Sequence, residues 1–244
     1  SLGNLKYAGL PLPVDEGKKA VLKEQFAGRP VWLVSSTHDD EESKIGRFLK
    51  DLEQKVPQVL TIIVPRHPHR GVEIKDKLVS EYGLNVALRS AGEAITPETE
   101  VYVADTIGEL GIFYELIPVV FIGGSLIPHG GQNFMEPSRY RDATIVGPHM
   151  FNFTDAMNRA RHANAIIEVN DVLELIDMVE RLDSLNRTYS KQFTDFLEYC
   201  NKMRKVKVYR QCLNFLKEVK KMADLKNARC TIKDEPILTC GGLV

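Results

Sequence analysis

Apolar and polar positions follow a β-α-β rhythm along most of the chain. Short, continuously apolar runs of strand length recur between residues 31 and 169, and amphipathic segments with helical spacing follow most of them. Because successive rather than alternate positions are apolar, we expect helices to cover both faces of the sheet. The pattern predicts an α/β, Rossmann-like parallel sheet with helices on both faces. The predicted strands are 31–35, 59–64, 86–88, 101–104, 119–122, 143–146 and 165–169, and helices 41–55, 72–82 and 108–116 lie between them.

The segments that flank this rhythm differ from it in composition. Residues 1–29 are rich in Gly and Pro around one helical patch at 18–26, which is typical of a linker. The Rossmann-like domain is predicted over 30–185, C-terminal helices over 186–223, and a tail over 224–244 that shows no usable period and is typical of a poorly ordered end. The helical patch at 206–222 is basic, which fits either a solvated helix face or contact with an anionic surface such as lipid head groups.

Charge and cysteine content narrow the class of protein. The net charge of -1 gives no global reason to expect a nucleic-acid partner. The cysteines Cys200, Cys212, Cys230 and Cys240 have no zinc spacing, so we expect free thiols in a reducing cytosol. We expect no membrane-spanning segment and no export signal, because the apolar runs are short and the first residues lack the charge pattern of a leader.

Chemistry-bearing residues gather directly after the predicted strands. Ser36, Thr37 and His38 follow the first strand, and Arg66 and His67 follow the second. Because ligands of parallel α/β sheets lie outside the carboxyl ends of the strands, we expect these side chains to meet at one edge. Arg66 offers a donor fork suited to phosphate or carboxylate, although an ordinary surface arginine is the alternative.

The stretch 121–148 joins two apolar runs through a Gly-rich loop, followed by a segment that the pattern predicts to become helical near Gln132. Its glycines, Gly123, Gly124, Gly130 and Gly131, allow positive φ angles and close approach of a ligand, and helix-start amides attract anions. We therefore expect phosphate or carboxylate at this loop.

Other polar residues leave two interpretations open. Asn133 and Glu136 would share one face of the predicted helix, where the carboxylate either accepts bonds from sugar hydroxyls or favours the helix dipole. Thr106 and Glu109 are spaced as a helix capping box, which we favour over a ligand role.

Five histidines fall in these loops without a metal-binding spacing, so we expect no metal. No P-loop, G-x-S-x-G or G-x-G-x-x-G after the first strand supports a kinase, hydrolase or NAD enzyme.

Six motifs in series resemble those of the 3-deoxy-D-manno-octulosonic acid (Kdo) transferases of lipopolysaccharide biosynthesis. The resemblance runs in order from about residue 3 to residue 180. Two departures are Gln132, where the family has His in GGHN, and the pair Phe134 and Met135, which replaces smaller residues. The motifs are GNLKY (3–7), SSTH (35–38), IIVPRHPHR (62–70), DTIGEL (105–110), FIGGSLIPHGGQNFMEP (121–137) and VGPHMFNF (146–153).

The resemblance implies a glycosyltransferase of the GT-B fold, of which this chain is the C-terminal, donor-binding domain. The full-length enzyme would move Kdo from CMP-Kdo to a lipid A precursor at the cytoplasmic face of the inner membrane, without a cofactor or metal. The general base, the acceptor site and the membrane-facing surface would lie in an N-terminal domain outside this sequence, so this fragment alone would bind CMP weakly and transfer nothing. Peripheral membrane contact is a further expectation.

The same resemblance assigns roles to residues of this chain. One group would surround the donor phosphate or the Kdo carboxylate, a second would offer backbone amides to the nucleotide phosphate, and a third would contact the ribose or sugar hydroxyls. Another GT-B nucleotide-sugar enzyme, such as a UDP-sugar transferase or epimerase, and a non-catalytic nucleotide-binding module are the alternatives. The three groups are Ser36, Thr37, His38, Arg66 and His67; Gly123, Gly124, Ser125, Gly130 and Gly131; and Asn133 and Glu136.

Overall fold

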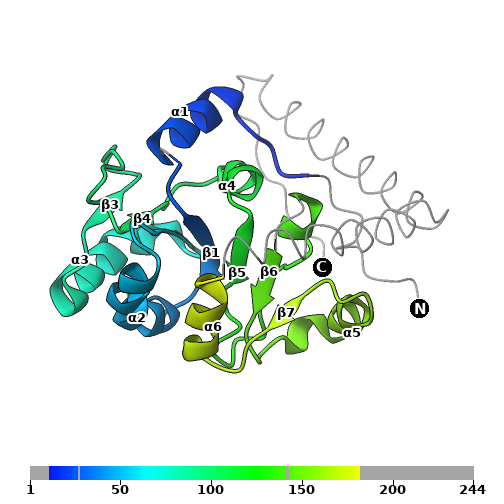
Figure 1. The fold of residues 1–244 in the computed structure, drawn as a ribbon. Coiled ribbons are helices and arrows are strands. Elements are labelled where there is room, and N and C mark those ends of the chain that lie inside the picture. The colour runs from blue at the N-terminus through cyan, green and yellow to red at the C-terminus, as the bar shows by residue number, and fades with distance from the viewer. Residues whose placement is uncertain (1–10, 27, 141–142, 182–244) are drawn as a thin grey trace, which may run out of the picture. The chain divides into compact units, whose positions relative to one another are not determined.

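The strands form one parallel sheet in the order β3-β4-β2-β1-β5-β6-β7 (Figure 1). The computed structural model describes residues 11–26, 28–140 and 143–181. The strands are β1 (Val31–Thr37), β2 (Leu60–Pro65), β3 (Val86–Leu88), β4 (Val101–Val103), β5 (Val119–Ile122), β6 (Ala143–Val146) and β7 (Ile167–Glu168). Every predicted apolar run overlaps a strand, which confirms the parallel α/β prediction.

Helices cover both faces of this sheet, as the continuously apolar strands predicted. Figure 1 shows α2, α3 and α6 along one face, and α1 and α4 along the other. The helices are α1 (Glu16–Phe26), α2 (Glu41–Lys55), α3 (Gly71–Tyr82), α4 (Leu110–Leu116), α5 (Thr154–His162) and α6 (Val172–Val179), with 3₁₀ turns at Pro68–Arg70, Pro137–Tyr140 and Phe151–Phe153.

The core is built from the central strands and the apolar stripes of the helices. Trp32 of β1 is fully buried and packs in one cluster with Ile45 and Leu49 of α2. Its indole N–H donates to the Thr61 hydroxyl at 2.9 Å, so the one polar atom of this ring is satisfied inside the core. The strands thus provide a rigid base for the loops at their carboxyl ends.

The helix α1, which lies within the predicted linker, packs onto the sheet domain. Its Leu22 and Phe26 are buried, and Lys18 pairs with Glu109 at 2.8 Å. Glu109 also accepts from Arg89 Nη2 at 2.9 Å and from the Thr106 hydroxyl. The Arg89 guanidinium lowers the pKa of Glu109 to about 2. The predicted capping box is therefore wrong, because both side chains bond within this ionic cluster and not to the backbone amides that open α4.

We expect Arg89→Met to lower the free energy of unfolding by about 2 kcal/mol at pH 7, because it leaves the buried Glu109 carboxylate with weaker partners. The depressed pKa means that the stabilisation by Glu109 is present above pH 4.5 and is lost as the pH falls toward 2. Urea unfolding at pH 7 and pH 3 measures both effects. If the two proteins differ by the same amount at both values, the ion pair is not the cause.

The predicted helix near Gln132 is wrong. Residues 124–136 form successive turns and irregular backbone, and only the 3₁₀ turn Pro137–Tyr140 follows. Gly130 and Gly131 have φ of 95° and 75°, a left-handed conformation that no helix contains. The predicted C-terminal helices, the tail and the four cysteines lie outside the described residues. Across the residues that are described, no helix has the length and apolarity needed to span a membrane.

Candidate functional site

The order of the strands places a crevice at the carboxyl ends of β1 and β5. From β1 the chain builds β2, β3 and β4 on one side, and it then returns to β5 on the other side of β1. The loops after these two strands diverge, and such a switch point is where open α/β sheets bind ligands. A pocket of about 270 Å³ lies there, and it is lined by Ser35, Ser36, Arg66, Leu110, Tyr114, Ile122, Gln132, Asn133 and Glu136. It brings together four residues of the predicted site, Ser36, Arg66, Asn133 and Glu136.

The end of β1 has an unusual backbone. Ser36 has φ of 58°, and the pairing with β2 is irregular between Ser35 and Thr37. A left-handed conformation is uncommon for a residue other than glycine, and it is found often at functional sites. Gly123 of the neighbouring loop allows this bulge to approach, because a Cβ atom at Gly123 would lie 2.4 Å from the Ser36 carbonyl oxygen.

Backbone amides of the Gly-rich loop bind a carboxylate that belongs to the chain itself. The backbone N–H groups of Gly124, Ser125 and Leu126 donate to Glu41 at 2.6, 3.1 and 3.0 Å, and the N–H of Gly123 donates to the Ser35 carbonyl at 2.7 Å. The expectation that amides of residues 123–125 bind a phosphate is therefore corrected: each has an internal acceptor.

Two predicted site residues, Thr37 and Ser125, are fully buried and hold the loops in place. The Thr37 hydroxyl donates to Glu42 at 2.7 Å, and Glu42 also accepts from Arg70 at 3.1 Å. The Ser125 hydroxyl donates to the Ile122 carbonyl and accepts from the Gly147 N–H at 2.8 Å. Both hydroxyls are thus used inside the protein, and the predicted place of Thr37 around the donor phosphate or the Kdo carboxylate finds no free side-chain group here.

Histidine rings gather beside the pocket. The rings of His38 and His129 lie 3.8 Å apart, and His67 lies 5.9 Å from His38, between centroids. Gln132 Nε2 lies 2.8 Å from Nε2 of His38, so this ring nitrogen accepts the amide proton. Burial, reinforced by the neighbouring His129, lowers the pKa of His38 to about 4, which keeps the ring neutral at pH 7.

Asn133 and Glu136 face the pocket from the loop after β5. Asn133 Nδ2 donates to Glu136 Oε1 at 2.9 Å, so the two side chains meet although no helix connects them. Burial raises the pKa of the Glu136 carboxyl. Gly131 donates its N–H to the Gly124 carbonyl at 2.8 Å, and the Gly130 carbonyl accepts from the Asn152 N–H at 3.2 Å. These glycines shape the loop, and the amide of Gly131 is not free for a phosphate.

Sequence reasoning missed Glu41 and Glu42. Acidic residues in the first turn of a helix are common because they favour the helix dipole, so their sequence position alone does not distinguish them from surface residues. Both are buried here, and burial raises the pKa of each. In the part of the chain that the structure describes, no group of His, Cys, Asp and Glu residues is arranged to hold a metal ion.

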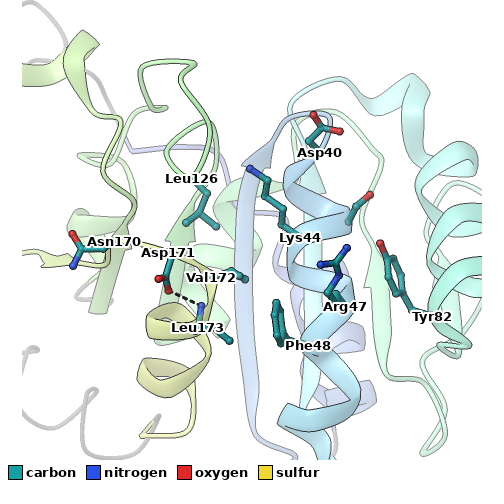
Figure 2. A pocket seen from close by; sticks show the side chains of 11 residues that line it. Asp40, Lys44, Arg47, Phe48, Tyr82, Leu126, Asn170, Asp171, Val172 and Leu173 are labelled. Atoms are coloured by element: carbon teal, nitrogen blue, oxygen red, sulfur yellow. Dashed lines mark hydrogen bonds between the residues drawn. The ribbon is translucent and has the colours of Figure 1, made fainter.

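A larger pocket, of about 530 Å³, lies elsewhere, between α2 and the start of α6 (Figure 2). Lys44, Arg47 and Phe48 line it from α2. On the other side, the Asp171 carboxylate accepts a hydrogen bond from the Leu173 N–H at 2.9 Å. None of the predicted site residues lines this pocket. We place the candidate site in the smaller pocket, because Ser36 of the bulge and Arg66 line it together with Gln132, whose side chain bonds to His38.

The sequence of the chain is similar to those of known Kdo transferases. The chain is 36% identical over 142 residues to the Kdo transferase of Haemophilus influenzae and 39% identical over 169 residues to a probable mitochondrial Kdo transferase of Arabidopsis thaliana. These matches cover 58% and 67% of this chain, and 33% and 38% of the relatives. The chain thus spans about a third of the length of the curated relatives that it matches. No family model matches it.

A solved structure shows which part of the relatives this chain matches. The C-terminal CMP-Kdo binding domain of WaaA from Acinetobacter baumannii matches with a TM-score of 0.68 and 31% identity, over 78% of this chain and 97% of that domain. Anabaena HepE (13% identity, TM-score 0.55, 88% of this chain and 56% of that one) shares the fold alone, which is that of a GT-B glycosyltransferase domain. The chain belongs to the 3-deoxy-D-manno-octulosonic acid transferase family and corresponds to the C-terminal domain of its members.

Proposed function

We propose that this chain is the donor-binding half of a glycosyltransferase that moves Kdo from CMP-Kdo to a lipid A precursor. The observation that carries the proposal is the match over nearly the whole length of a CMP-Kdo binding domain, together with a pocket at the switch point that Arg66 lines. In this proposal the acceptor, the general base and contact with the cytoplasmic face of the inner membrane belong to the rest of the full-length protein.

The charges around the pocket suit an anionic donor. CMP-Kdo carries one negative charge on its phosphodiester and one on its carboxylate, and Arg66 offers the planar donor fork that binds such groups. Arg66 is exposed, and within the described residues no carboxylate pairs with it. His38 and His67 add ring nitrogens beside it. We assign the anion to these side chains and to Ser36, since the loop amides already bind Glu41.

The remaining residues of the pocket fit a sugar. The paired Asn133 and Glu136 present an amide and a carboxyl, which can bond to hydroxyls of the ribose or of Kdo. Positive groups fixed at the leaving phosphate would stabilise the departing CMP, and this is the part of the reaction that a donor domain can supply. The isolated chain is expected to bind CMP and to transfer nothing.

Calorimetric titration of the chain with CMP tests this function. We expect weak binding, with a Kd of roughly 1 mM or below, and an affinity about tenfold lower in Arg66→Ala, since one charge-assisted contact is lost. Arg47→Ala is the matched control, because Arg47 is also exposed but lines the larger pocket. Absence of CMP binding to the unmodified chain contradicts the proposal.

A thermal-shift comparison of CMP with UDP separates the proposal from another nucleotide-sugar enzyme. A ligand raises Tm only by binding the folded state, so CMP should protect the chain more than UDP at equal concentration. Stronger protection by UDP would favour the UDP-sugar alternative, in keeping with the fold shared with HepE.

A further inference from the structure

We propose that Glu41 is a positioning residue of the donor site: its carboxylate acts as an internal anion that fixes the Gly-rich loop and the loop after β1 in the geometry that receives the donor. The inference rests on the proposed function and deepens it. It assigns a role to a residue that does not line the pocket itself.

The carboxylate makes four hydrogen bonds, two to each oxygen. Oε1 accepts from the N–H groups of Ser125 and Leu126 at 3.1 and 3.0 Å, and Oε2 accepts from those of Gly124 and His38 at 2.6 and 3.1 Å. Glu41 is fully buried. A side chain at the first residue of α2 thereby joins two loops that are more than 80 positions apart in the sequence.

Three successive N–H groups that point at one centre form an anion-binding concavity. In many proteins such a concavity holds a phosphate from a ligand. Here the start of α2, whose dipole favours a negative charge, supplies the anion from within the chain. A donor phosphate cannot enter the same place, so it is directed to the exposed side chains on the pocket side of the loop, Arg66 foremost.

The contacts of the loop carry this effect to the pocket. Gly124 binds Glu41 through its N–H and accepts from the Gly131 N–H at 2.8 Å, while Gln132 donates its own N–H to the Gly123 carbonyl at 3.1 Å. The Gln132 side chain in turn donates to the ring of His38, and the backbone N–H of His38 donates to Glu41. One hydrogen-bond network that includes Glu41 thus fixes the ring of His38 and the side-chain amide of Gln132.

The variant Glu41→Gln keeps the shape of the side chain but replaces one acceptor oxygen by an NH₂ group, which faces N–H donors and loses two of the four bonds. We expect the full chain to bind CMP at least tenfold more weakly. We also expect NMR titration to move the pKa of His38 from about 4 toward its ordinary value of 6.5, because the loosened loops admit water. The control Glu53→Gln, an exposed position on α2, should change neither measurement.

The two measurements have separate meanings. If the unmodified chain binds no CMP, the proposed function fails, but the titration of His38 still tests Glu41. The positioning role is overturned if the Glu41→Gln variant binds CMP within twofold of the affinity of the unmodified chain and its His38 titration is unchanged. If Glu41→Gln does not fold, Glu41→Asp is measured instead; its shorter carboxylate reaches only one loop, and unchanged values for both readouts would again overturn the inference.

Discussion

Replacing Gly123 by alanine is expected to lower the free energy of unfolding by about 3 kcal/mol, the upper part of the range for overpacked core positions. The added Cβ atom would lie 2.4 Å from the Ser36 carbonyl oxygen, 2.6 Å from the Ser36 carbonyl carbon and 2.7 Å from the Thr37 Cα. All three are backbone atoms at the ends of the central strands, so no side chain can move aside to make room. The same displacement would disturb the bulge at Ser36 and abolish CMP binding.

Urea unfolding followed by far-UV circular dichroism measures the loss in stability. Gly17→Ala in α1 is the matched control, because its Cβ atom would contact only the side-chain oxygen of Asp15, at 3.3 Å, and alanine favours a helix. We expect the control to change stability by no more than about 0.5 kcal/mol. If Gly123→Ala unfolds at the same urea concentration as the unmodified chain, the loop at Gly123 has room for a Cβ atom beside Ser36, which contradicts the prediction.

Acid is expected to destabilise the chain through His38 by about 3 kcal/mol between pH 6.5 and pH 4. Burial lowers the pKa of His38 to about 4 in the folded state, and the neighbouring His129, His67, Arg66 and Arg70 lower it further in the same direction. A depressed pKa means that the unfolded chain binds the proton first as the pH falls. The stabilisation is therefore present above pH 6.5, the value of an unperturbed histidine, and is lost toward pH 4.

Comparison with His38→Gln isolates this effect from the other titrating groups. Glutamine keeps a polar side chain beside Gln132 but has no proton to gain, so the variant should lose less stability than the unmodified chain between pH 6.5 and pH 4. Urea unfolding at half-unit intervals of pH gives the two curves. Parallel curves over this range would mean that His38 titrates normally and is not enclosed by the loops.

Much of the fold follows from the local pattern of the sequence. Continuously apolar runs predicted each strand that the structure describes, since a strand buried on both faces needs apolar residues at successive positions. The predicted helix at Gln132 is absent, and the glycines just before it, Gly130 and Gly131, adopt the left-handed region. Glycine permits the left-handed and the right-handed region, and the sequence does not say which the loop adopts.

The sequence also predicted some features of the candidate site and left others open. That Ser36 and Arg66 meet at one edge follows from their place at the ends of two parallel strands, because carboxyl ends of parallel strands share an edge. Asn133 and Glu136 reach the same pocket from the loop after β5. That Thr37 and Ser125 turn inward does not follow from the sequence, since a hydroxyl after a strand is equally suited to a ligand and to a loop.

By itself the sequence determined the family, the parallel sheet and the edge of the sheet where the donor is expected, because each depends on local residue patterns or on motifs in series. Only the tertiary structure decided which groups at that edge remain available. Glu41 and the Gly124 loop are far apart in the chain, and their bonds arise from the pairing of β1 with β5. Since a buried amide takes whichever acceptor the fold brings to it, the partner of the Gly-rich loop could be known only once the strands were in place.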